Sequence, residues 1–174
     1  MAQNETTASS ATSVLNQALR LEIESFLFLD AQLLDEWRLD DWGKTIAPGA
    51  RYMVPSLDEP NAGYQDSLYL ISDDYLTLMS RISQLQGRNA WVENPKSRTR
   101  RMISNVQANE TDNNQIEVKA NFAIWRFHQE STMTYVGRYE HLLVREDDRL
   151  LFKVRKSILD METLRPHGRI SIIL

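Results

Sequence analysis

The chain has 174 residues, a net charge of −4 and no cysteine. This length fits one domain, and the lack of thiols excludes disulfides, thiolate nucleophiles and cysteine-ligated zinc or iron–sulfur sites. The acidic balance argues against a general nucleic-acid binder. No apolar run approaches the roughly 20 residues that cross a bilayer, and a basic start followed by an apolar stretch, as in a signal peptide, is absent.

The N-terminal part of the chain has helical periodicity. Residues 1–12 are small and polar, which predicts a disordered tail before a single domain over residues 13–174. Ser13 is the expected N-cap of a helix that continues to Leu29, with apolar residues at helical spacing: Leu15, Leu19, Ile23 and Phe26. Asp30 is expected to cap a second, shorter helix through Trp37, and Pro48 with Gly49 breaks the pattern.

A strand and another helix are expected next. Ala50–Leu57 predicts a strand, whereas Leu68–Ser72 is ambiguous. Ser72–Gln86 predicts a helix that Ser72 caps and Gly87 stops. The spacing puts four apolar residues on one face of this helix: Leu76, Met79, Ile82 and Leu85.

The second half of the chain has the pattern of an antiparallel sheet. Short polar links, which join antiparallel neighbours, connect four β segments: Thr99–Asn109, Gln115–Phe127, Thr132–Arg145 and Arg149–Asp160. Trp125 and Phe127 are out of phase with the second segment, so either a bulge re-aims them or the opposite face is also covered there. A last strand, Arg169–Ile173, is expected to be held in its own sheet or against a neighbouring subunit. Helices followed by a meander predict an α+β fold, with a curved sheet around the helices.

The three histidines do not form a predicted metal site. If the hairpin between the second and third segments turns near Glu130, His128 faces Thr132 and His141 faces Lys119. A next turn near Asp147 places His141 opposite Lys153 or Val154, so no two histidines meet across either hairpin, although His167 is free to fold near one of them. A two-histidine, one-carboxylate iron site is therefore not expected.

Other catalytic patterns are also missing from the sequence. There is no glycine-rich phosphate loop, GxSxG elbow or HExxH helix. Asp73 and Asp74 fit the positive end of a helix better than a metal site. Proton transfer inside an apolar pocket, by a tyrosine or a carboxylate, remains an alternative, as does a small-molecule-binding module.

Two segments suggest a protein interface. Arg98 and Arg100 share a strand face in the run Ser97-Arg98-Thr99-Arg100-Arg101, and arginine is enriched where protein surfaces meet. A solvated strand is the alternative for this run. The second segment, Arg165–Leu174, combines basic residues with an apolar end. Arginine and tyrosine commonly anchor interfaces, and the interface residues that we predict are Arg98, Arg100, Arg101, Tyr139, Arg165, His167 and Arg169.

Five segments in order carry a family resemblance: Asp30–Ser56, SRTRRMISNV (Ser97–Val106), NFAIWRF (Asn121–Phe127), YVGRYEHLL (Tyr135–Leu143) and the ending SILDMETLRPHGRISIIL. Together they resemble the β (small) subunit of bacterial aromatic-ring-hydroxylating dioxygenases, the Rieske non-heme iron oxygenases. The resemblance extends over Phe28–Leu174, which is nearly the whole predicted domain.

This resemblance implies a cone-shaped α+β fold like that of nuclear transport factor 2, with the N-terminal helices inside a strongly curved antiparallel or mixed sheet. It further implies a structural, non-catalytic subunit of a bacterial cytoplasmic α3β3 hexamer, with a trimer of β subunits beneath the α subunits. The α subunit would hold the Rieske [2Fe–2S] cluster and the mononuclear iron. It would receive electrons from NADH through a reductase and ferredoxin, and add O2 to an aromatic ring as a cis-dihydrodiol. This chain would hold no cofactor, metal or catalytic residue, and would contact neither nucleic acid nor membrane.

Overall fold

The computed structural model describes residues 2–61, 63, 68–87, 93–111, 113–164 and 169–174, and for residues 2–15 it describes the backbone alone. Within these residues it contains three helices, α1 (Ala2–Asp35), α2 (Leu39–Gly43) and α3 (Tyr75–Gln86). It also contains six strands: β1 (Ile46–Pro55), β2 (Tyr69–Asp74), β3 (Arg98–Glu110), β4 (Gln115–His128), β5 (Ser131–Glu146) and β6 (Arg149–Leu159).

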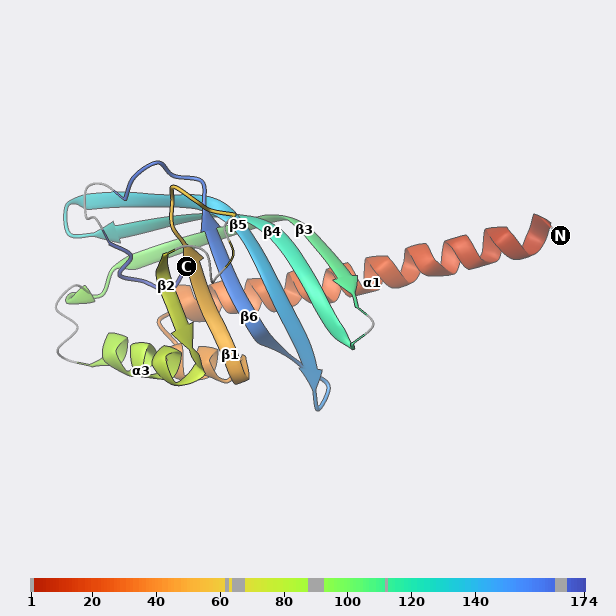
Figure 1. Ribbon diagram of the computed structural model, residues 1–174, viewed down its shortest axis with the longest axis horizontal. Coiled ribbons are helices and arrows are strands. Elements are labelled where there is room, and N and C mark those ends of the chain that lie inside the picture. The colour runs from red at the N-terminus through yellow and green to blue at the C-terminus, as the bar shows by residue number, and fades with distance from the viewer. Residues whose placement is uncertain (1, 62, 64–67, 88–92, 112, 165–168) are drawn as a thin grey trace.

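The six strands form one mixed, curved sheet. Their order is β2-β1-β6-β5-β4-β3, in which β1 and β6 are parallel and all other neighbours are antiparallel. Figure 1 shows this sheet curving over the C-terminal part of α1, while the N-terminal part of the helix extends beyond the ends of β3 and β4. The predicted α+β architecture, with helices inside a curved sheet, is therefore confirmed.

Helix α1 differs from the prediction at both ends. It begins at Ala2, whereas the sequence predicted a disordered tail over residues 1–12; the division into a tail and a domain over residues 13–174 stays a prediction. It also continues to Asp35, so the prediction that Asp30 caps a second helix is wrong. The Asp30 carboxylate is instead buried and accepts a hydrogen bond from Trp42 Nε1 at 2.7 Å.

Helix α3 begins later than predicted. Ser72 belongs to β2, which settles the ambiguous segment as a strand, and Asp74 caps α3 by accepting a hydrogen bond from Thr77 N at 2.8 Å. The helix ends before Gly87 as predicted, but its buried face differs. Leu78 and Ile82 are buried, whereas Leu76 is 75 % exposed. The helix face predicted from the spacing of apolar residues is therefore partly rotated away from the core.

The four predicted meander strands are confirmed within one residue at each end. The β4–β5 register places His128 opposite Ser131 and His141 opposite Val118, one residue from the predicted partners. Strand β1 begins at Ile46, before the predicted start, and it includes Gly49. Gly49 has a φ of 71° where the β1–β6 register shifts, so this glycine allows a bulge instead of a break.

The predicted last strand, Arg169–Ile173, is not a strand in the described residues 169–174. Its apolar end is nevertheless held inside the molecule, because Ile172, Ile173 and Leu174 are buried. Leu174 N donates to Tyr52 Oη at 3.0 Å, and the Leu174 backbone oxygen accepts from Arg155 and Ser157. Side chains of the cone thus anchor this segment in place of a strand ladder.

Candidate subunit interface and the buried network behind it

Strand β3 divides the basic segment between two faces, because side chains alternate along a strand. The inner side chains are buried: Ser97, Thr99 and Arg101. The outer side chains are exposed: Arg98, Arg100 and Met102. The prediction that Arg98 and Arg100 share a face is confirmed, and the segment has one structural and one exposed half.

The inner half ties β3 to α1 and to the C-terminal segment. Asp35, at the end of α1, accepts hydrogen bonds from Thr99 Oγ1 at 2.8 Å, Arg101 N at 3.0 Å and Arg101 Nη1 at 2.5 Å. Arg101 Nη2 donates to the backbone oxygen of Ile173 at 2.5 Å. The Arg101 side chain is 2 % exposed, so it acts inside the chain and offers almost no surface to a partner.

The outer half continues across the sheet as an apolar and basic surface. The unbroken register pairs Arg98 with Phe127 and Arg100 with Trp125, and it aligns Met102, Ala123 and Val136 across three strands. Trp125 and Phe127 therefore reach the outer face without a bulge. We call this surface the outer patch, and its residues are Arg98, Arg100, Met102, Trp125, Phe127 and Val136.

The outer patch has the composition of a protein interface. Met102, Phe127 and Val136 are 61 %, 40 % and 45 % exposed, and arginine, methionine and aromatic residues are the types enriched where proteins meet. The side chains of Arg98 and Arg100 form no ion pair or hydrogen bond with another described residue. The patch thus combines exposed apolar area with two uncompensated positive charges.

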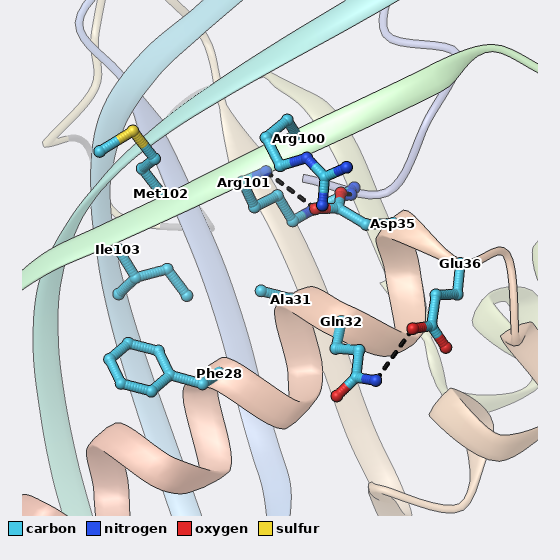
Figure 2. A pocket seen from close by; sticks show the side chains of 9 residues that line it. All are labelled: Phe28, Ala31, Gln32, Asp35, Glu36, Arg100, Arg101, Met102 and Ile103. Carbon is cyan, nitrogen blue, oxygen red and sulfur yellow. Dashed lines mark hydrogen bonds and ion pairs between the residues drawn. The ribbon is translucent and has the colours of Figure 1, made fainter.

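A groove lies beside this patch, between α1 and β3 (Figure 2). Its volume is about 380 Å³, and Phe28, Ala31 and Ile103 give it an apolar floor. Figure 2 shows the Arg101–Asp35 ion pair at one end of the groove and Gln32 bonded to Glu36 along its rim. Phe28 is 54 % exposed although it is a large aromatic side chain, so the groove presents apolar surface to solvent.

A second buried network fills the cone. Arg155 is fully buried and donates to Asp30 Oδ1 at 2.8 Å and to the Leu174 backbone oxygen at 3.0 Å. Its guanidinium carbon lies 5.0–5.6 Å from the ring centres of Trp42, Tyr139 and Phe152, which adds cation–π attraction. Burial opposes the charge of Arg155, but the Asp30 carboxylate, Tyr139 and Tyr52 together outweigh this effect and raise the Arg155 pKa. This ion pair joins α1, α2, β6 and the C-terminal segment.

The side chains of Tyr139 and His141, which lie beside Arg155, are uncharged at neutral pH. Burial raises the pKa of Tyr139 to about 12. Burial and then the nearby Arg155 charge lower the pKa of His141 well below its ordinary value of 6.5. The neutral His141 accepts a hydrogen bond from Lys156 N through Nδ1 at 3.2 Å, and its ring packs 4.6 Å from that of Tyr139. The proton-transfer alternative relied on a tyrosine or a carboxylate; in the cone Asp30 is held by Arg155 and Trp42, and the raised pKa of Tyr139 keeps its hydroxyl protonated.

A third buried carboxylate, Glu93, was missed by the sequence analysis. It accepts hydrogen bonds from Arg126 Nε at 2.9 Å, Ser97 Oγ at 2.6 Å and Ser171 Oγ at 2.6 Å. The signal was present in the strand pattern, because Arg126 occupies an inward position between Trp125 and Phe127. An arginine on the buried face of a strand predicts a buried acidic partner.

The predicted interface residues therefore separate into three groups. Arg98, Arg100 and Arg169 are exposed. The prediction of a direct partner contact does not fit Arg101 or Tyr139, because both side chains are buried within the chain itself. The remaining two, Arg165 and His167, lie outside the described residues.

The sequence of this chain matches the model of one protein family. That family is described as the ring hydroxylating beta subunit, and the match covers residues 29–166. The chain belongs to this family. A related sequence, the small oxygenase component of the p-cumate 2,3-dioxygenase system of Pseudomonas putida, is 39 % identical over 156 residues. These residues are 89 % of this chain and 87 % of that protein, so this β subunit is similar to it over most of its length.

Solved structures show the same fold. A chain of naphthalene 1,2-dioxygenase, with indole bound in its active site, gives a TM-score of 0.78 at 20 % identity, over 99 % of this chain and 98 % of that chain. The beta subunit of benzoate 1,2-dioxygenase from Burkholderia mallei gives a TM-score of 0.69 at 21 % identity, over 80 % and 89 %. The predicted cone-shaped fold of dioxygenase β subunits is confirmed.

The described residues contain neither a candidate metal cluster nor a helix that could span a membrane. No three histidine, aspartate or glutamate side chains in this part of the chain gather closely enough to hold a metal ion. Among the helices of the described residues, none combines the length and apolar content of a membrane span.

Proposed function

We propose that this β subunit assembles with a larger catalytic α subunit into an α3β3 oxygenase, in which it supplies buried interface area and fixed subunit geometry. The observation that carries the proposal is the family match over residues 29–166, together with 39 % identity to a small oxygenase component. The structure supports a structural role, because the cone is filled by large side chains and by the neutralised Asp30–Arg155 pair.

The chemistry belongs to the partner in this proposal. The α subunit holds a Rieske [2Fe–2S] cluster and a mononuclear iron, and a ferredoxin with its reductase delivers electrons from NADH. The assembled enzyme adds both atoms of O2 to an aromatic ring in the bacterial cytoplasm. Because the related small component belongs to a p-cumate 2,3-dioxygenase system, p-cumate is the first substrate that we would test.

The outer patch is the surface that we propose for subunit contacts. Its two arginines lack partners among the described residues, so an acidic surface on a neighbouring subunit would pair with them. Arg98→Ala with Arg100→Ala should weaken assembly and leave the melting temperature of the isolated β subunit nearly unchanged. Arg101→Ala should do the opposite, because its charge partner Asp35 lies in the same chain.

The first experiment is the solution mass of the purified chain, alone and after co-expression with the large-subunit gene. A trimer of about 61 kDa, three times the 20.2 kDa chain, would support the proposal, as would an equimolar hexamer that contains iron and that consumes NADH with p-cumate once ferredoxin and reductase are added. A monomer or dimer that does not bind the large subunit would refute it.

A further inference from the structure

The groove between α1 and β3 contains an open strand edge. Strand β3 is the last strand of the sheet, so one of its sides faces no neighbouring strand. Arg101 N donates to Asp35 on α1 and not to β4, so the backbone groups of Arg101 point toward this open edge. Because backbone direction alternates along an antiparallel strand, the N–H and C=O groups of Ile103 point the same way. Neither group has a partner at this edge among the described residues.

The regular part of this open edge is short, because a contact bounds it at one end and a bulge at the other. Asp35 covers the edge at Thr99 and Arg101. Beyond Ser104 the β3–β4 register shifts, and Asn105 has a φ of 54°. A bulge of this kind kinks a strand and shifts its register. An added strand that pairs at Ile103 would therefore lose its register beyond this point, although β3 itself continues to pair with β4 up to Glu110.

The side chains at this edge specify what such a strand would carry. Phe28, Ala31 and Ile103 line the floor, which favours an apolar side chain (Figure 2). On the rim, Glu36 is already partnered by Gln32 at 2.9 Å and Arg38 at 3.6 Å. Arg100 has no such partner among the described residues, so the uncompensated charge is positive and favours an acidic side chain.

We propose that this groove binds a short extended segment of the large α subunit, which adds a strand at Ile103. An apolar side chain of that segment fills the floor beside Phe28. An acidic side chain an odd number of positions from that apolar one lies on the opposite face of the added strand. Arg100 lies on the same face of β3, so the acidic side chain pairs with Arg100. The inference rests on the proposed function, because it assigns the α subunit as the occupant.

The test compares groove variants with matched controls in the full-length chain. Phe28→Ser and Arg100→Glu change the groove. The controls make comparable changes elsewhere: Leu21→Ser replaces an exposed apolar residue of α1 outside the groove, and Arg149→Glu reverses a charge on the β5–β6 hairpin. Each variant is mixed with purified α subunit, and the dissociation constant, the mass of the complex and the melting temperature of the isolated β subunit are measured.

We expect both groove variants to weaken binding to the α subunit at least tenfold, and both controls to bind like the wild type. Hydrogen exchange at the Ile103 amide should slow when α subunit is added to the wild type, since a filled edge protects this N–H. Overlapping peptides of the α subunit should include one acidic and apolar segment that competes for binding.

Three results would contradict the inference. If the groove variants bind like the controls and Ile103 exchange is unchanged, the groove is not the docking site, although the proposed function stands. If the variants lose self-association and still bind the α subunit, the occupant is a second copy of this chain. If wild-type β subunit does not bind the α subunit at all, the proposed function fails with it.

Discussion

Replacing Asp30 with asparagine should destabilise the chain strongly, although the two side chains have nearly the same shape. Asparagine keeps an oxygen that can accept from Trp42 Nε1, so the 2.7 Å hydrogen bond is retained. It removes the charge that neutralises Arg155, whose side chain is 1 % exposed. The variant therefore tests the charge of the pair separately from its packing.

The expected size of the effect follows from the burial of both partners. Breaking a buried ion pair by removing one charge costs about 3–5 kcal/mol, because the other charge stays in the interior without compensation. For a chain of this length each kcal/mol lowers the melting temperature by roughly 2–4 °C, so the total fall is roughly 6–20 °C. Urea unfolding and thermal melting of the isolated chain, both followed by circular dichroism, measure these quantities.

Two further variants make the comparison decisive. Glu22→Gln breaks the Glu22–Arg145 pair, whose side chains are 42 % and 32 % exposed, and it should cost at most about 1 kcal/mol. The double variant Asp30→Leu with Arg155→Met removes both buried charges and should be more stable than Asp30→Asn. The reasoning is refuted if Asp30→Asn costs no more than Glu22→Gln, or if the double variant is the least stable.

Three other predictions concern single positions in the cone. Because the pKa of His141 is lowered in the folded chain, the unfolded chain binds more protons than the folded chain as pH falls below 6.5. The free energy of unfolding therefore falls on acidification by up to about 1.4 kcal/mol per pH unit. His141→Gln should flatten this slope between pH 6.5 and 5 in urea titrations, and an unchanged slope would contradict the assignment. Gly137→Ala should prevent stable folding, since its Cβ would lie 2.0 Å from a carbonyl oxygen of β6, whereas Gly43→Ala, with 3.4 Å of space, should be tolerated; equal melting temperatures would be the contrary result. Tyr52→Phe should cost about 1–3 kcal/mol, because it leaves a buried N–H without its acceptor, whereas Tyr139→Phe should cost less, because the Tyr139 hydroxyl has no partner among the described residues; the reverse order would count against the hydrogen-bond assignment.

The strands were predictable because their signal is local. Alternating side chains and short polar turns located the ends of β3 to β6 within one residue, and the turn near Glu130 gave the β4–β5 register within one residue. The same alternation predicted that Arg98 and Arg100 share a face. A curved sheet over a helix follows from apolar faces that must be covered.

The helix ends were less predictable because local propensity competes with tertiary contacts. Asp30 resembles an N-cap in the sequence, but Trp42 and Arg155 hold its carboxylate inside the cone. Ser72 is also a good cap, yet pairing with β1 keeps it in a strand. In both cases partners distant in the sequence outweighed a local preference of about 1 kcal/mol.

The sequence by itself determined the fold class, the meander of strands and the family, since these depend on periodicity, turn chemistry and ordered motifs. Only the tertiary structure decided which charged side chains are exposed and which are buried in ion pairs. Arg100 and Arg101 are adjacent, but the strand pleat exposes one and places the other against Asp35. The groove beside them exists because a long helix and the last strand of the sheet lie next to each other, and their side chains do not fill the space between them. Such a contact depends on how two distant segments pack, and no local pattern encodes it.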